Sequence, residues 1–218
     1  MVSHNILFDL DGTLNDSKPG IEMSYCHTLQ TLGYGKPSQA SLDLSIGPPL
    51  EDNFMRFMNT QDPELISRAT EIYLQFYDQE GIHHSALYPH IKTLLQNLHQ
   101  QNLRLYLATS KSQDHAEQHL LDFGIDHYFT GVQGASRDGS LRYKVDIIDR
   151  VATAHQLNSA VSLMIGDHKV DILGGKHHGM KTIGVTYGYG TREELLAANP
   201  DALCEQPERL LSIIKTLL

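Results

Sequence analysis

Short apolar runs alternate along this chain with longer segments in which apolar residues recur every three or four positions. The short runs are typical of buried strands, and the longer segments are typical of amphipathic helices. Clear runs occupy residues 6–8, 103–108, 161–165 and 182–185, and a weaker one occupies residues 128–132. Strands that alternate with helices in this way predict an α/β fold built on a doubly wound parallel sheet.

Residues 16–85 break this alternation, because they contain two helical stripes and no convincing strand. The stripes are Ile21, Tyr25, Leu29 and Leu32, and then Leu65, Ala69, Ile72 and Phe76. Between them, the prolines and glycine of residues 46–50 rule out a continuous helix. The pattern predicts a small α-helical cap domain, residues 16–85, inserted after the first strand of an α/β core made of residues 1–15 and 86–218.

The composition and charge of the chain indicate which partners and which cellular compartment to expect. Of the 218 residues, 40% are hydrophobic and 20% are charged, as in ordinary globular proteins. The formal net charge of −9 argues against nucleic acid or an anionic membrane surface as the main partner. The sequence shows no signal peptide and no apolar run of membrane-spanning length, and the distant Cys26 and Cys204 are expected to stay reduced. We therefore expect a cytoplasmic protein, with both a monomer and a homodimer open.

The most informative chemistry lies at Asp9 and Asp11, which follow the first apolar run and precede a glycine. Charged side chains are rarely buried without a partner, so two of them at a strand end indicate a metal site, a proton-transfer site or both. Residues two apart in an extended segment point to the same side, so these carboxylates can converge on one ligand. Ligands of open α/β sheets bind beyond the carboxyl ends of the strands, which is where this pair is expected.

Further polar groups follow other predicted strands or begin a predicted helix. They are Thr109-Ser110-Lys111, Lys144, and the residues from Gly166-Asp167 to Asp171. Carboxylates suit a hard cation such as Mg²⁺, and hydroxyl and lysine donors hold phosphate oxygens. One carboxylate can attack phosphorus while a second transfers protons, if the metal and a lysine screen the repulsion. The set predicts phosphoryl transfer from a small phosphorylated metabolite.

These residues resemble, in chain order, the four motifs of the haloacid dehalogenase superfamily. The matching positions are Asp9-x-Asp11-Gly12-Thr13, Thr109, Lys144 and Gly166-Asp167-x-x-x-Asp171. Four motifs in order at strand ends are highly specific, and the resemblance spans the whole chain. It implies a Rossmann-like core with a small helical cap, and Mg²⁺-dependent hydrolysis of a phosphomonoester through an aspartyl-phosphate.

The resemblance also implies a role for each carboxylate. Asp9 would be the nucleophile and a Mg²⁺ ligand. Asp11 would be the general acid and base, and a metal ligand through its backbone carbonyl. Asp167 would bind Mg²⁺ directly, and Asp171 would contribute to the metal site through water or by pairing with Lys144.

Phosphate binding is implied at a second set of positions. Thr109 and Lys144 would act in catalysis by holding the phosphoryl group, and Lys144 would also orient the carboxylates. Gly12 and Ser110 are expected to contact the same phosphate. Thr109 and Ser110 are further expected to cap the helix that follows them, since a helix N-terminus is itself an anion site.

The resemblance is closer still to the phosphoglycolate phosphatase-like branch, which includes proteins named 5′-nucleotidases, at residues 46–50 and 187–191. Two positions depart from that branch. Val145 stands where many relatives have proline, and Asn15 stands where an apolar or β-branched residue is more usual. Phosphoglycolate, nucleoside monophosphates and small sugar phosphates all stay open as substrates, and cap residues 47–53 are expected to select among them.

Two rival functions are weighed against the phosphatase. A phosphomutase of the β-phosphoglucomutase type shares all four motifs and the cap, but returns the phosphoryl group to a sugar. A non-catalytic binding module is expected to lack a motif carboxylate, and none is missing here.

Several residues allow a functional and a purely structural interpretation. Lys111 either reaches the phosphate or is an exposed residue in the first turn of a helix. His115 and His119 are spaced for a metal but lack the accompanying ligands, so surface or capping roles are favoured. Residues 188–190, a tyrosine between two glycines, form either a flexible rim over the site or a plain turn.

Overall fold

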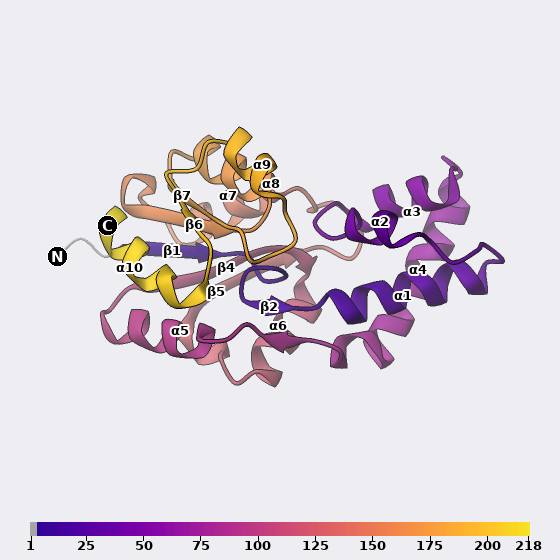
Figure 1. Ribbon diagram of the computed structural model, residues 1–218, viewed down its shortest axis with the longest axis horizontal. Helices are drawn as coiled ribbons and strands as arrows, with labels where there is room; N and C mark the ends of the chain where they lie inside the picture. Colours follow the sequence, from indigo (N-terminus) through magenta and orange to yellow (C-terminus); the bar gives the residue numbers. More distant parts are fainter. Residues whose placement is uncertain (1–3) are drawn as a thin grey trace. The chain divides into compact units, whose positions relative to one another are not determined.

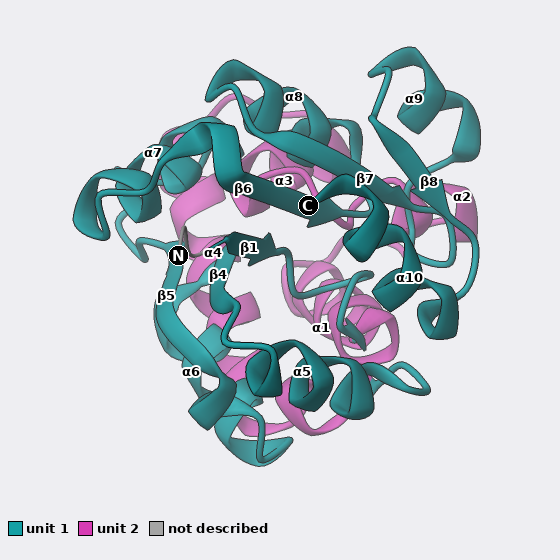
Figure 2. Cartoon of the chain, turned by 90° about the vertical axis from the view of Figure 1, so that its left-hand side faces the viewer, with its two compact units in different colours: residues 1–16, 87–218 teal, residues 17–86 magenta. Residues whose placement is uncertain are grey.

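The computed structural model describes residues 4–218. The chain divides into two compact units, one of Met1–Asp16 with Leu87–Leu218 and one of Ser17–Ala86 (Figure 2). Both boundaries lie one residue later than the sequence predicts. We refer to the first unit as the core and to the second as the cap.

The core contains a parallel sheet of six strands within the described residues. In spatial order the strands are β5 (Phe129–Ala135), β4 (Arg104–Ser112), β1 (Asn5–Phe8), β6 (Ser162–Gly166), β7 (Lys181–Val185) and β8 (Ala202–Cys204). β1 is central, and its last residue, Phe8, lies opposite Leu107 of β4 and Ile165 of β6. Whatever follows Phe8 therefore lies between the carboxyl ends of β4 and β6.

Helices cover both faces of this sheet, which confirms the predicted doubly wound α/β fold (Figure 1). They are α5 (Ile91–Gln100), α6 (Gln113–Asp122), α7 (Lys144–Ala154), α8 (Lys169–His177), α9 (Arg192–Ala197) and α10 (Pro207–Leu217). Because side chains alternate along a strand, Ile6 and Phe8 pack in the cluster with α5, α6 and α10, while Leu7 packs in the cluster with α7. All three side chains are fully buried, each contributing about 1.5–3 kcal/mol of hydrophobic stabilisation.

The strands differ from the predicted ones in two respects. The weak run at residues 128–132 is a true strand, β5, and β8 is an edge strand that the apolar pattern did not reveal. β8 has three residues, which is too short to show an alternation of apolar and polar positions. Single-turn 3₁₀-helices are found at Gly81–His83, Asp126–Tyr128 and Ser159–Val161.

The cap contains four α-helices: α1 (Lys18–Thr31), α2 (Gln39–Asp43), α3 (Leu50–Met58) and α4 (Pro63–Gln79) in the described chain. α1 and α4 correspond to the two predicted stripes, whereas α2 and α3 are shorter and were not predicted. Tyr25 lies in the middle of an aromatic cluster, with ring centroids 5.4 Å from Phe54 and 4.8 Å from Tyr73. Pro49 precedes α3 as its N-cap residue, as expected for a proline that cannot continue a helix.

Two further features complete the description of the fold. The short strands β2 (Asn15–Asp16) and β3 (Ala86–Leu87) pair in a second, two-stranded sheet. Among the helices of residues 4–218, none has the length and apolar character needed to span a membrane.

Candidate active site

Asp9 follows β1 directly, at the point where the central strand ends. Its N–H still donates to the carbonyl of Ile165, at 2.9 Å, so the residue stays in line with the sheet. The chain then turns tightly, with the N–H groups of Thr13 and Leu14 both donating to the carbonyl of Leu10. Gly12 takes a φ of 79° in this turn, a conformation that side chains other than glycine rarely adopt.

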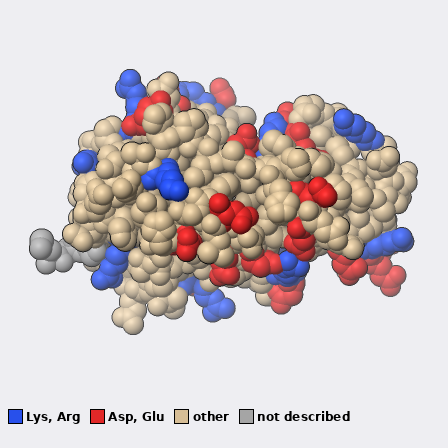
Figure 3. Space-filling view, turned by 90° about the horizontal axis from the view of Figure 1, so that it is seen from below, with Lys and Arg blue, Asp and Glu red and all other residues tan. Residues whose placement is uncertain are grey.

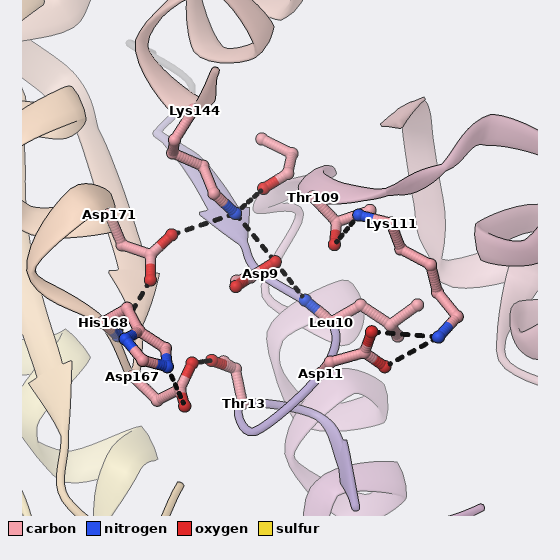
Figure 4. A network of polar contacts seen from close by, with 11 residues as sticks. Asp9, Leu10, Asp11, Thr13, Thr109, Lys111, Lys144, Asp167, His168 and Asp171 are labelled. Atoms are coloured by element: carbon pink, nitrogen blue, oxygen red, sulfur yellow. Dashed lines mark hydrogen bonds and ion pairs between the residues drawn. The ribbon is translucent and has the colours of Figure 1, made fainter. Parts of the chain in front are cut away.

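Lys144 is the buried centre of a charge network at this end of the sheet (Figure 4). It begins α7, and its Nζ lies 2.8 Å from Oδ1 of Asp9, 3.0 Å from Oδ1 of Asp171 and 2.9 Å from the carbonyl oxygen of Ala108. The contact with Ala108 is a hydrogen bond, and the contacts with Asp9 and Asp171 are ion pairs. Burial opposes the charge of Lys144, but the carboxylates of Asp171 and Asp9 outweigh it and hold its pKa above the usual value.

The two carboxylate oxygens of Asp9 have different surroundings. Oδ1 accepts the N–H of Leu10, at 2.8 Å, as well as the contact from Lys144. Within residues 4–218 the structure records no hydrogen bond to Oδ2, and the side chain keeps 12% of its exposure. Asp9 therefore has one oxygen fixed by donors and one available to react.

Asp167 follows β6 and is completely buried. Its Oδ2 accepts the N–H of Tyr189 at 2.7 Å, and its Oδ1 lies 3.4 Å from the hydroxyl of Thr13. Burial, together with the nearby carboxylates of Asp9 and Asp171, raises the pKa of Asp167 to about 7. His168, whose Nε2 lies 3.9 Å from Asp167 Oδ2, acts in the opposite direction.

The loop of residues 187–191 turns at residues 186–190 and packs against Asp167. A Cβ on Gly188 would lie 2.4 Å from the Asp167 Cβ, and one on Gly190 would lie 2.0 Å from the Asp167 carbonyl oxygen. The tyrosine between them uses its hydroxyl to bind Asp16, at 2.8 Å. The turn interpretation of these glycines therefore fits the structure, and their lack of a side chain allows close packing on Asp167, which is distant in sequence.

Asp9, Asp167 and Asp171 form a buried acidic trio in the described part of the chain. One carboxylate oxygen from each lies within 4.8 Å of the others. Burial raises the pKa of Asp171 as well, although Lys144 works against this shift. Three converging carboxylate oxygens are the type of donor that suits a hard divalent ion such as Mg²⁺. Asp171 also accepts the N–H of His168 through Oδ2, at 3.0 Å, which fixes it at the start of α8.

Asp11 lies apart from this trio and is paired with Lys111. The Lys111 Nζ is 2.9 Å from Oδ2 and 3.2 Å from Oδ1 of Asp11. The lysine belongs to β4, and its side chain is only 6% exposed, so its interpretation as an exposed helical residue was wrong. Sequence reasoning missed this pair, although the two-residue spacing from Thr109 along a continued strand was the available signal.

Thr109 and Ser110 lie within β4, which continues to Ser112 past an irregularity in its pairing with β5. Thr109 is buried, and its hydroxyl accepts the N–H of Lys111 at 3.3 Å. Ser110 is half-buried, and its hydroxyl makes no hydrogen bond that the structure records among residues 4–218. Because α6 begins only at Gln113, with Ser112 as its N-cap residue, the expectation that Thr109 and Ser110 cap this helix was wrong.

The two histidines on α6 are also buried, which corrects the favoured surface interpretation. His115 and His119 are 6% and 1% exposed. The Nδ1 of His115 lies 2.7 Å from the Ser112 hydroxyl, and the ring of His119 stacks on Phe123 with centroids 5.5 Å apart. Neither belongs to the acidic trio, and both serve packing on the covered side of the helix.

Comparison with known proteins places this geometry in a family. A family model described as haloacid dehalogenase-like hydrolase matches residues 6–185. A 5′-nucleotidase of Pseudomonas aeruginosa is 34% identical over 212 residues, or 97% of this chain and 96% of that protein. A phosphoglycolate phosphatase of Vibrio parahaemolyticus is 32% identical over 217 residues, or 96% of this chain and 95% of that protein.

A solved structure supports the same assignment. The crystal structure of a predicted phosphatase from Clostridium acetobutylicum matches with a TM-score of 0.93 and 33% identity, and covers 99% of this chain and 100% of that one. The resemblance noted from the four motifs is thereby confirmed. The chain belongs to the haloacid dehalogenase-like hydrolase family and is one of its phosphatases, enzymes that hydrolyse phosphoric monoesters.

Proposed function

We propose that this enzyme hydrolyses a small phosphomonoester in a Mg²⁺-dependent reaction that passes through an aspartyl-phosphate on Asp9. The observation that carries this proposal is the asymmetry of the Asp9 carboxylate. Lys144 and the Leu10 N–H hold Oδ1, while Oδ2 has no donor among the described residues and the Asp9 side chain keeps 12% of its exposure. A nucleophile needs this combination, since one oxygen must be oriented and the other must be free to attack.

In the first half-reaction, Oδ2 of Asp9 attacks the phosphorus of the substrate. The bond from phosphorus to the leaving oxygen breaks, and Asp11, which enters this step in its protonated form, gives its proton to that oxygen, which departs as an alcohol. Asp9 is then an acyl phosphate, and Asp11 is a carboxylate. Lys144 keeps its contact with Oδ1 and so keeps the Asp9 side chain in place.

In the second half-reaction, water attacks the phosphorus of the aspartyl-phosphate. Asp11 accepts one proton from this water, the bond from phosphorus to Asp9 breaks, and inorganic phosphate is released. Both carboxylates are returned to their starting states, so the proton count is balanced over the cycle.

Asp9, Asp167 and Asp171 are the residues that would hold Mg²⁺, with the backbone carbonyl of Asp11 as a further ligand. When bound, the cation supplies positive charge that screens the repulsion between a carboxylate nucleophile and a phosphate. Lys144 alone cannot balance the buried trio, because it carries one charge against three carboxylates.

Thr109, Lys144, Gly12 and Ser110 are the residues proposed to bind the phosphoryl oxygens. The side chain of Ser110 and the turn at Gly12 lie at the same end of the sheet as Asp9. Lys144 already contacts three oxygens, so a phosphate oxygen must replace one of them. We expect it to replace the Ala108 carbonyl oxygen, which is the uncharged one of the three.

The substrate is proposed to be a small metabolite such as phosphoglycolate or a nucleoside monophosphate, as the names of the two relatives suggest. On the face shown in Figure 3, basic side chains lie singly or in small groups among acidic ones, which supports a small anion over a polyanion as partner. Cap residues 47–53 are proposed to choose the leaving group. Asn53 fixes this loop by donating to the carbonyls of Ser45 and Pro48, at 2.7 and 3.3 Å.

The experiment compares wild type with Asp9→Asn against a panel of phosphomonoesters, with Mg²⁺ and with EDTA. We expect turnover of every substrate to disappear in the variant and in EDTA, and acid-quenched wild type to carry radiolabelled phosphate on Asp9. If Asp9→Asn still hydrolyses a generic aryl phosphate, the nucleophile is another residue. Release of inorganic phosphate from a hexose phosphate supports the phosphatase, whereas an isomeric hexose phosphate as product identifies a mutase.

A further inference from the structure

Lys111 and Asp11 lie one hundred residues apart in the sequence and meet at the carboxyl end of the sheet. The Lys111 ammonium contacts both oxygens of the Asp11 carboxylate, at 2.9 and 3.2 Å (Figure 4). The side chain of Lys111 is 6% exposed and that of Asp11 is 16% exposed. An ion pair so shielded from water has a more fixed geometry than a surface pair, whose partners exchange with solvent.

Two lysine ammonium groups in the described part of the chain lie at this site, and they contact different carboxylates. Lys144 contacts Asp9 and Asp171, both members of the buried trio. Lys111 contacts Asp11, whose carboxylate lies outside that trio. Lys111 therefore does not duplicate Lys144, because the two lysines contact different carboxylates.

The main chain of Lys111 is fixed independently of its side chain. Its N–H donates to the hydroxyl of Thr109, at 3.3 Å, and both residues belong to β4. The ammonium consequently projects from β4, whereas Asp11 projects from the turn that follows β1. A strand is the more precise support for a group that must fix the position of another.

We propose that Lys111 is a positioning residue that holds the Asp11 carboxylate where it can exchange a proton with the leaving oxygen. This inference rests on the proposed function, in which Asp11 is the general acid and base. A general acid must lie within hydrogen-bonding distance of the oxygen that it protonates, and small displacements of reacting groups lower rates strongly. The alternative is that Lys111 binds the substrate phosphate directly.

The two roles differ in how they depend on the leaving group. Nitrophenolate is a stable anion that departs without a proton, whereas a primary alkoxide needs one. If Lys111 acts through Asp11, then Lys111→Met lowers kcat/KM for an alkyl phosphate by about 10²-fold and that for p-nitrophenyl phosphate by far less. If Lys111 binds phosphate, both substrates lose the same factor, because both carry the same phosphate.

A double-mutant cycle with the full-length enzyme tests the proposal further, using kcat/KM for an alkyl phosphate. Lys111→Met should have no added effect once Asp11→Asn is present, because a positioning residue has nothing left to position. Lys111→Arg keeps the charge and should recover most of the activity. Lys181→Met is the matched control. It also removes a lysine that is paired with an aspartate, Asp201 at 3.3 Å, but the Lys181 side chain is 56% exposed, against 6% for Lys111.

Each outcome assigns the failure to one hypothesis. If Asp11→Asn leaves hydrolysis of the alkyl phosphate unchanged, the acid–base role in the proposed function is wrong, and the positioning role is wrong with it. If Asp11→Asn lowers kcat/KM for the alkyl phosphate but the effects of the two substitutions are additive, or if Lys111→Met lowers kcat/KM equally for both leaving groups, only the role of Lys111 is wrong. Thermal melting of Lys111→Met and Lys111→Arg separates a folding defect from either result.

Discussion

The backbone N–H of Tyr189 donates to Oδ2 of Asp167 across 2.7 Å, and the N–H of Gly190 lies 3.4 Å from the same oxygen. Asp167 is fully buried, so these N–H groups replace the water that a carboxylate would otherwise bind. The loop after β7 thus orients a carboxylate at the end of β6. Groups that hydrogen-bond to a metal ligand in this way orient the ligand and influence the affinity of the site for the metal.

Gly188→Ala is expected to disturb this arrangement. The new Cβ would lie 2.3 Å from the carbonyl oxygen of Gly12 and 2.4 Å from the Asp167 Cβ, so the main chain or the carboxylate must move. Because loss of such support typically lowers metal affinity by about 10–100-fold, we expect a drop of that size in Mg²⁺ binding. Titration calorimetry and the Mg²⁺ dependence of phosphatase activity measure it.

The matched control for this prediction is Gly35→Ala. No heavy atom lies within 4 Å of the Cβ that this substitution adds, and its φ is not in the positive range. The control should bind Mg²⁺ as wild type does. Equal Mg²⁺ affinity in all three proteins would show that the loop does not support Asp167.

The raised pKa of Asp167 predicts how the stability of the metal-free enzyme varies with pH. Its folded value of about 7 exceeds the value of about 3.9 for an unfolded aspartate, so the folded protein binds more protons between the two. Stability is therefore lost as the pH rises through this window. Asp167→Asn removes the titration, and the variant should become progressively more stable than wild type from about pH 4 to about pH 7.

Thermal unfolding in EDTA across that range measures the difference. At a pH above about 7, excess Mg²⁺ should make wild type more stable than Asp167→Asn, because the cation stabilises the carboxylate and not the amide. Parallel pH profiles for wild type and variant in EDTA would mean that another group is responsible for the titration.

Much of the fold and site could be predicted because the signals are local. The run at residues 6–8 and the carboxylates that follow it are contiguous, and parallel strands bring their carboxyl ends to one edge of the sheet. Asp9, Lys144, Asp167 and Asp171 accordingly meet where the topology requires.

What could not be predicted depends on the register and length of particular strands. Lys111 reaches Asp11 because β4 continues past an irregularity to Ser112, and the sequence alone places the strand end three or four residues earlier. The burial of His115 depends likewise on where α6 begins. Such features arise from contacts between segments far apart in the chain, which a periodic pattern does not record.

Lys144→Met is expected to destabilise the fold as well as to abolish activity. The substitution leaves Asp171, which is completely buried, without its cation. Removing one partner of a buried ion pair typically costs about 3–5 kcal/mol, and urea unfolding in EDTA should show a loss of this size. The double variant Lys144→Met with Asp171→Asn removes both charges and should recover part of it. A double variant as unstable as the single one would show that lost packing, and not the unpaired charge, is responsible.

Asn15 has an unsatisfied side chain within the described structure, and its replacement is expected to change stability. Its side chain is fully buried, and neither Oδ1 nor Nδ2 has a hydrogen-bond partner among residues 4–218. An unpaired buried amide costs about 1–3 kcal/mol, so Asn15→Val should raise the free energy of unfolding by about that amount. Asn5→Val is the control: Asn5 is buried too and its Oδ1 is also unpaired, but its Nδ2 donates to the Ser162 hydroxyl at 3.1 Å, and loss of that hydrogen bond should destabilise. If the hydrogen bond determines the effect, urea unfolding shows a higher free energy of unfolding for Asn15→Val and a lower one for Asn5→Val. A loss of stability in Asn15→Val would instead show that its amide is satisfied in solution.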